Sequence, residues 1–248
     1  MSRLGAALSR RLARAVKTRG LRVRAHRPIV SFTFDDVPRS AFSIGGPILE
    51  AAGACGTYYV AGKLVGTTSE SWPHLDLDDL RRLSERGHEL GCHTFSHARA
   101  PLLSARAFRQ ETEANQEFLV RACGDIRLTN FAWPFGEVSP ARKLQAQATY
   151  ATCRGITPGV NFGVADLGLL RAVALYDETR DDRAVEALFE RAQATNGWLI
   201  FYTHDVQDRP TQYGASIDQL RHAVRLALDR GFEILTIRNA VGRLAFTR

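Results

Sequence analysis

Residues 28–36 read Pro-Ile-Val-Ser-Phe-Thr-Phe-Asp-Asp. The part from Pro28 to Phe34 is apolar and β-branched, a composition that is typical of a buried strand. The strand ends at two adjacent carboxylates, Asp35 and Asp36. This stretch therefore predicts a strand that carries two acids at its carboxyl end.

Strand-like and helix-like segments alternate along the rest of the chain. Strands are expected at residues 28–34, 56–61, 89–94, 128–133, 153–156, 169–175, 198–203 and 233–237, and helices at 76–87, 104–122, 140–149, 182–194 and 216–230. Regular alternation of this kind favours a mostly parallel sheet covered by helices. With 248 residues and no internal repeat or linker, an α/β fold in a single domain is predicted.

Polar residues follow several of these strands directly. They are Asp35 and Asp36, His93 and His97, the turn Pro134-Phe135-Gly136, and His204. In a β/α barrel the carboxyl ends of the strands converge on one face, where active sites lie. These residues are therefore expected around one pocket. One carboxylate and two imidazoles would match the three protein ligands of a catalytic zinc site, so a metal-dependent hydrolase is the first hypothesis.

The net charge of +7 is concentrated in the first 27 residues, which hold nine Arg and Lys and no acid. We therefore expect a basic leader over 1–27 and a separate catalytic domain over 28–248. Apolar side chains in the leader fall on one arc of a helix: Leu4, Leu8, Leu12, Ala15 and Val16. One interpretation is an amphipathic helix on an anionic membrane surface, and the other is a solvated, frayed terminus. No nucleic acid is expected as a partner, because no aromatic residue is interleaved with the charges.

The sequence favours a cytoplasmic protein, and the membrane interpretation of the leader would place it at the inner face of the cell membrane. The longest apolar run in the leader, residues 4–8, is shorter than a signal peptide requires, and no run is long enough to span a bilayer. The four cysteines form no C-x-x-C pair and are expected to be free thiols.

Four segments in order resemble the polysaccharide deacetylases of the NodB-homology group, carbohydrate esterase family 4. They are Thr33-Phe34-Asp35-Asp36, His93-Thr94-Phe95-Ser96-His97, Trp133-Pro134-Phe135-Gly136 and Tyr202-Thr203-His204-Asp205. The resemblance covers roughly residues 28–240. It implies a distorted, TIM-like (β/α) barrel of seven to eight strands and the removal of acetyl groups from a sugar.

The resemblance also implies roles for individual residues. Asp36, His93 and His97 would bind a divalent metal, with Zn²⁺ expected first and Co²⁺, Ni²⁺ or Fe²⁺ also compatible with these ligands. Asp35 would be the general base and His204 the general acid. The backbone N–H of Phe135 would stabilise the oxyanion, while Trp133 and Pro134 would help to form the substrate pocket. Since consecutive residues of a strand point to opposite faces, Asp35 and Asp36 can both serve only if the chain turns there.

Two features depart from the family pattern. Ala132 stands where the family commonly has an arginine that touches the catalytic carboxylate, and Arg154 or Arg171 could supply that charge instead. The family's fourth motif, which is acidic and contains a tryptophan, is not recognisable near residues 156–163. The group that orients His204 is therefore left open. His26, His74, His88 and His222 are expected to be surface or structural residues.

The expected function is metal-dependent deacetylation of N-acetylated hexosamines in a polysaccharide or a lipid-linked glycan precursor. An O-acetyl esterase or another amide hydrolase stays open, because fold and metal ligands do not determine the substrate. A non-catalytic glycan-binding or assembly protein is the alternative from another class. It is favoured by Ala132 and by the missing fourth motif.

Overall fold

The structure is a computed structural model, and it describes residues 9, 11–177 and 181–245. Leu4 and Leu8 of the expected amphipathic helix lie outside this range. The strands are β1 (Gly20–Val23), β2 (Ile29–Asp35), β3 (Thr57–Val60), β4 (Glu89–Cys92), β5 (Asn130–Ala132), β6 (Thr152–Arg154), β7 (Gly163–Asp166), β8 (Val173–Ala174), β9 (Trp198–Thr203) and β10 (Glu233–Ile234). The main helices are α2 (Gly46–Ala51), α3 (Leu77–Glu85), α4 (Ala105–Cys123), α5 (Pro140–Thr149), α6 (Asp182–Ala194), α7 (Ile217–Asp229) and α8 (Ile237–Ala245).

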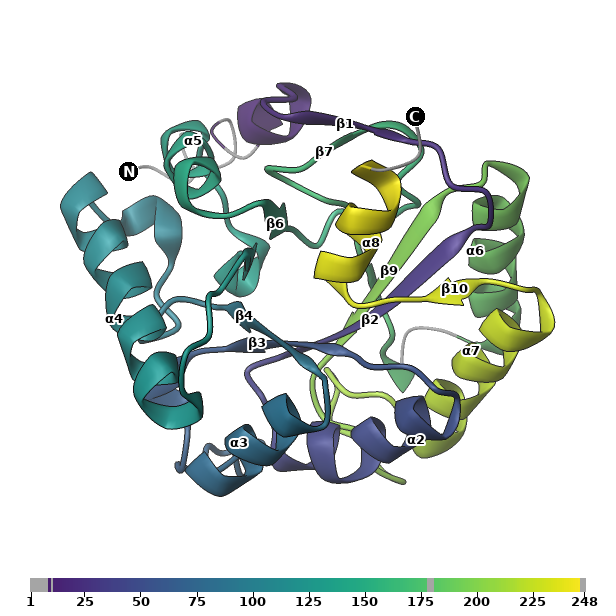
Figure 1. The fold of residues 1–248 in the computed structure, drawn as a ribbon, viewed down its shortest axis with the longest axis horizontal. Coiled ribbons are helices and arrows are strands. Elements are labelled where there is room, and N and C mark those ends of the chain that lie inside the picture. Colours follow the sequence, from purple (N-terminus) through teal and green to yellow (C-terminus); the bar gives the residue numbers. More distant parts are fainter. Residues whose placement is uncertain (1–8, 10, 178–180, 246–248) are drawn as a thin grey trace.

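Seven parallel strands form one curled sheet in the order β6-β5-β4-β3-β2-β9-β8, and β10 pairs with the amino end of β2. Figure 1 shows α2 to α7 around the outside of this sheet. The sheet is a half-barrel, which confirms the predicted α/β fold with a distorted, TIM-like barrel in one domain. A parallel arrangement brings the carboxyl ends of the strands to the same edge, as the placement of the motifs requires.

β2 lies in the interior of the sheet, because it pairs with both β3 and β9, and all seven of its residues are buried. Its two hydroxyl side chains have partners inside the core. Thr33 Oγ1 donates to the carbonyl of Phe201 at 2.8 Å, and Ser31 Oγ accepts from the indole N–H of Trp198 at 2.9 Å. A buried polar group costs little when it is hydrogen-bonded, so β2 can hold its position between two strands.

The helices begin where their capping residues predict. Side chains at five N-caps accept a hydrogen bond from the backbone N–H three residues later: Asp76, Ser104, Ser139, Asp181 and Ser216. All five predicted helices are present with boundaries within two residues of the structure. In the described part of the chain, we find no helix with the length and apolar character needed to cross a bilayer.

Some elements were not predicted. α2 follows a turn of π-helix (Ala41–Gly45), in a stretch for which no element was expected. The strand expected over residues 233–237 is only β10, because Ile237 already begins α8. β1 lies within the basic leader and pairs antiparallel with β7, at one edge of the molecule in Figure 1.

The four cysteines, which all lie in the described ranges, form no disulfide.

Candidate active site

One pocket, with a volume of about 510 Å³, lies at the carboxyl ends of β2, β4, β5 and β9. Of the residues predicted for the site, the following line it: Asp35, Asp36, His93, His97, Trp133, Phe135 and His204. Pro134 is buried in the turn after β5 and does not belong to the wall. Motifs that are up to 169 residues apart in the sequence therefore meet at the carboxyl edge of the sheet.

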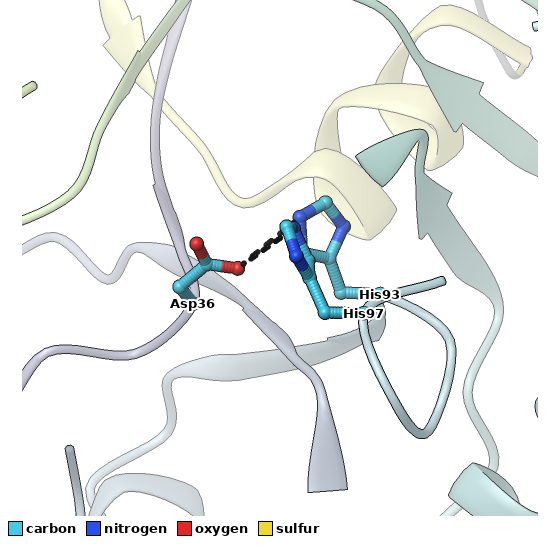
Figure 2. A group of neighbouring side chains, drawn as sticks. All are labelled: Asp36, His93 and His97. Carbon is cyan, nitrogen blue, oxygen red and sulfur yellow. Dashed lines mark ion pairs between the residues drawn. The ribbon is translucent and has the colours of Figure 1, made fainter. Parts of the chain in front are cut away.

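Asp36, His93 and His97 form the cluster that could hold a metal ion. Asp36 Oδ1 lies 3.5 Å from His93 Nε2 and 3.2 Å from His97 Nε2, and one ligand atom from each residue lies within 4.8 Å of the others. Figure 2 shows both imidazoles pointing toward this carboxylate. His93 Nδ1 is 2.8 Å from the carbonyl of Ala132, which can only accept, so Nδ1 carries the proton and Nε2 keeps its lone pair for a ligand.

The donor set fits a divalent cation. Asp36 Oδ1 is buried, and among the described residues it has no hydrogen-bond partner, which is unusual for a buried carboxylate oxygen and expected for a metal ligand. Burial lowers the pKa of His93 to about 3 and that of His97 to about 4. Both rings are therefore neutral near pH 7, as coordination requires. Burial also raises the pKa of Asp36 to about 6, so this carboxylate is costly to ionise without a cation.

Left-handed backbone places these side chains. Asp36, Thr94, His97 and Phe135 have φ values of 59°, 57°, 55° and 58°, and the β-branched Val37 has 48°. Such conformations are uncommon outside glycine and each costs about 1–3 kcal/mol. The turn at Asp36 is what lets Asp35 and Asp36 line the same pocket although they are adjacent on a strand. Backbone strain is therefore concentrated at the predicted motifs.

Arg154 is the partner of Asp35, and both side chains are almost fully buried. Its Nη2 donates to Asp35 Oδ2 at 2.6 Å and also to Oδ1. Burial raises the pKa of Asp35, but the charge and the hydrogen bond of Arg154, together with the imidazoles of His93 and His204, outweigh burial and keep this pKa below the ordinary value of 3.8. Asp35 is therefore an ionised carboxylate inside the pocket.

Arg154 on β6 pairs in register with Ala132 on β5. The family pattern places an arginine at the position of Ala132. In this chain the positive charge beside Asp35 comes instead from Arg154 on the neighbouring strand β6. Its guanidinium also lies 5.0 Å from the ring centre of Tyr59 and 5.1 Å from that of Tyr202. Arg171, the other candidate, lies elsewhere and donates to the carbonyl of Pro158.

His204 is oriented by two residues that the sequence analysis missed. Its Nδ1 lies 3.2 Å from the carbonyl of Tyr213, and the ring of Trp72 stacks on it with centres 5.5 Å apart. Its Nε2 lies 3.8 Å from Asp36 Oδ2. Because a carbonyl only accepts, Nδ1 carries a proton and Nε2 is the ring nitrogen left for chemistry. Trp72, which lies in the loop before α3, thus helps to orient His204. The sequence analysis had left the group that orients this histidine open.

His74, expected to be a surface or structural residue, is buried and lines the pocket. Its Nδ1 lies 2.8 Å from the backbone carbonyl of Asp36, so it ties the loop before α3 to the turn that carries the metal ligand. The Trp-Pro-His run at residues 72–74 was the only sequence signal in this loop.

The two aromatic residues of the third motif have different surroundings. Trp133 is 1% exposed and packs against Phe108 and Phe131. Phe135 is 48% exposed, lies against His97 and has the guanidinium of Arg99 4.0 Å from its ring centre. Phe135 is therefore the one of the two that a ligand can reach over a large area.

A family model described as "Polysaccharide deacetylase" matches residues 22–153, just over half of the chain. The chain belongs to this family. The matched range contains Asp35, Asp36, His93 and His97 and the turn at Phe135, whereas His204 lies beyond it. A comparison with curated proteins finds no match.

Solved structures with the same fold include carbohydrate esterases and deacetylases. The Xyl-CE4 domain of a multidomain xylanase from the hindgut metagenome of Trinervitermes trinervoides is 18% identical, with a TM-score of 0.61 over 89% of this chain and 92% of that chain. A family 4 acetyl xylan esterase from Clostridium thermocellum, in complex with a cobalt ion, is 20% identical, with a TM-score of 0.61 over 86% and 90%. The family 4 carbohydrate esterase PdaA from Bacillus subtilis is 14% identical, with a TM-score of 0.61 over 98% and 90%. At these identities the likeness establishes the fold.

Proposed function

We propose that this family member is a metal-dependent N-deacetylase that acts on N-acetylated hexosamines of a polysaccharide or a lipid-linked glycan precursor. The observation that carries the proposal is the meeting, in one pocket, of the Asp36–His93–His97 cluster with an ionised Asp35 and with His204. This combination offers a cation site, a base and an acid within a few ångströms of one another.

Asp36, His93 and His97 would hold the ion, with zinc as the first expectation and cobalt, nickel or iron as alternatives. A bound divalent ion supplies Lewis-acid polarisation of the acetyl carbonyl and of the attacking water. The neutral imidazoles and the unpartnered Asp36 oxygen support this assignment.

Asp35 would act as the general base. It faces the pocket, and Arg154 keeps it ionised, so it can accept a proton from water that attacks the acetyl carbonyl. Arg154 also holds the carboxylate in position. The backbone N–H of Phe135 is proposed to donate to the oxyanion, a contribution of about 3–4 kcal/mol for a well-placed donor.

His204 would act as the general acid through Nε2. Its Nδ1 proton stays with the carbonyl of Tyr213, so a second proton on Nε2 can pass to the departing nitrogen. An amine must leave as a neutral molecule, because an amine anion is a very poor leaving group. The acid is therefore more important for an amide than for an ester.

The pocket wall suggests how a sugar ring would be held. Trp133 is enclosed by the core, so we propose that it shapes the wall, while the buried Pro134 supports the turn whose Phe135 and Gly136 line the pocket. Phe135, Trp72 and Tyr213 line the pocket with aromatic rings on which a sugar face would lie. The volume of about 510 Å³ is in the range of small-ligand sites and admits one sugar unit with its acetyl group.

An O-acetyl esterase is the second candidate, and the similarity to an acetyl xylan esterase favours it. The non-catalytic alternative rested on Ala132 and on the missing fourth motif. Arg154 occupies the place beside Asp35 that Ala132 left open, and Trp72 and the carbonyl of Tyr213 lie against His204, whose orienting group the fourth motif left in doubt. His204→Gln separates the two hydrolases. It should abolish N-deacetylation and leave part of the activity on O-acetyl sugars, whose leaving group needs less help from an acid.

We further propose that residues 28–248 form the catalytic domain and that the leader, residues 1–27, contacts the anionic inner face of the cell membrane. The exposed apolar side chains of Leu12 and Val16 and the basic charge around them support this contact. Fractionation of cells that express the full chain tests it. Recovery wholly in the soluble fraction at low salt would contradict it.

The test of the activity is acetate release from a panel of N-acetyl and O-acetyl sugars, before and after chelation and with metal added back. We expect activity on N-acetylhexosamines that chelation abolishes and Zn²⁺ restores. Asp35→Asn should lose acetate release while the protein still binds one metal ion. Activity that survives thorough chelation would contradict the proposal.

A further inference from the structure

A second cleft, of about 690 Å³, lies between the basic leader and the segment that contains β7. Four cationic side chains line it: Arg14, Lys17, Arg171 and Arg191. They come from four separate parts of the chain, namely the helical residues 11–15, the turn after them, the segment before β8, and α6. The fold therefore gathers positive charge here that no single stretch of sequence reveals.

This charge is not neutralised by the protein. Within the described ranges, none of the four cations forms an ion pair with a carboxylate. The cleft contains one acid, Asp166, and that acid is already bound to the buried Lys143 at 2.5 Å. Asp166 also accepts from the backbone N–H of Gly168 at 3.1 Å. Because none of these four cations is paired with a described carboxylate and the acid is already compensated, the cleft attracts anions.

The walls of the cleft are held by hydrogen bonds. Lys17 Nζ donates to the carbonyl of Val164 at 2.7 Å, and Arg171 Nη1 donates to the carbonyl of Pro158 at 2.8 Å. The amide of Asn161 binds both the N–H and the carbonyl of Arg171, which fixes this residue in the wall. An anion would therefore meet cations whose positions are partly set before it binds, and this lowers the entropic cost of binding.

The cleft is separate from the active site. Asn161, in the wall of the cleft, forms backbone hydrogen bonds with Trp198 at the amino end of β9. His204 follows the carboxyl end of the same strand. Six residues of strand at roughly 3.3 Å each place the two sites about 20 Å apart. A ligand in the cleft therefore does not touch Asp35, Asp36 or the histidines.

We propose that this cleft binds a phosphate group, independently of the proposed deacetylation. Guanidinium groups recognise phosphate oxygens through paired N–H donors, and Arg171 and Arg191 both line the cleft with Lys17 and Arg14 beside them. The phosphate can belong to a free phosphate or pyrophosphate ion, or to a phospholipid headgroup. The ring of Phe162 and the methyl groups of Val164 lie in the same cleft, and each side chain is 45% exposed. They would contact the glycerol and the first acyl carbons next to such a headgroup.

The experiment uses the full chain and the variants Arg171→Gln and Arg191→Gln. Arg221→Gln on α7 is the matched control, because Arg221 is an exposed arginine outside the cleft. Calorimetric titration with inorganic phosphate and with pyrophosphate measures the free ions. Co-sedimentation with phosphatidylcholine vesicles, with and without phosphatidylglycerol, measures the headgroup. Unfolding midpoints confirm that each variant is folded.

Each cleft variant should weaken binding about tenfold, which is the effect of losing one charge-assisted hydrogen bond, and the control should not. If the cleft variants weaken the binding of phosphate or pyrophosphate in the calorimetric titration, the ligand is a free phosphate ion. If they weaken only the binding to phosphatidylglycerol vesicles, the ligand is a phospholipid headgroup. Acetate release should be unchanged in both cleft variants. Binding of neither probe, or equal weakening by Arg221→Gln, would overturn the proposal and leave only non-specific attraction to a basic protein.

Discussion

The buried pair of Arg154 and Asp35 allows a quantitative test of how the site is held together. Arg154→Gln leaves the Asp35 carboxylate buried without its counter-charge. With Nη2 2.6 Å from Oδ2, the two charge centres are about 4 Å apart, and their attraction is about 4 kcal/mol at an effective dielectric constant of about 20. Removing one partner of a buried pair typically costs about 3–5 kcal/mol. We expect Arg154→Gln to lower the free energy of unfolding by about 4 kcal/mol and acetate release at least 100-fold.

A double-mutant cycle isolates this interaction. Asp35→Asn should also destabilise the protein, because it leaves Arg154 buried and unpaired. The double variant carries neither charge, so it should cost about as much as either single change rather than their sum. Urea unfolding of the four chelated proteins gives the coupling energy, with Arg171→Gln as an exposed control. A coupling energy below about 1 kcal/mol would refute the reasoning.

Three further results are expected. His97→Ala should lower zinc affinity at least 100-fold in a calorimetric titration, because it removes one of three protein ligands. Trp72→Ala should lower kcat about tenfold with little change in metal content, since it removes the ring that stacks on His204. Chelated protein should lose about 4 kcal/mol of unfolding free energy between pH 7 and pH 4. On unfolding, His93 and His97 regain an ordinary pKa of 6.5 and take up protons, which lowers the free energy of unfolding by about 3 kcal/mol for each. Asp36, whose pKa is raised to about 6 in the folded protein, offsets about 2 kcal/mol of this loss.

Each of these results has a contrary outcome. Unchanged zinc affinity in His97→Ala would remove that residue from the ligand set. Loss of metal in Trp72→Ala would mean that the ring supports the metal ligands rather than His204. The sign of the pH effect follows from the lowered histidine pKa values, whose stabilisation is complete above pH 6.5 and is lost as the pH falls. Unfolding midpoints that are constant from pH 7 to pH 4 would contradict it.

The sequence predicted the sheet and the place of the motifs because both depend on local patterns. The apolar run that ends at Asp35 indicated β2, and alternating patterns indicated its neighbours and five helices. Two of these helices were expected to begin at Ser104 and Ser216, and both residues are the N-caps in the structure. Parallel strands then bring their carboxyl ends together without further information, which is why residues as distant as Asp36 and His204 could be placed in one pocket.

Other parts of the site depend on contacts that no local pattern encodes. The pairing of Arg154 with Asp35 requires the register between β5 and β6, in which Arg154 stands opposite Ala132. The position of Trp72 on His204 depends on the path of an irregular loop, and the carbonyl of Tyr213 is a backbone atom that carries no sequence signal. α8 was hidden because its first residue, Ile237, also suits a strand.

The most direct test of the central claim is the crystal structure of the zinc-loaded protein, recorded at the zinc absorption edge. The account predicts one anomalous peak within about 2.0–2.2 Å of His93 Nε2, His97 Nε2 and an oxygen of Asp36. A peak bound by other residues, or no peak in protein that releases acetate, would contradict it.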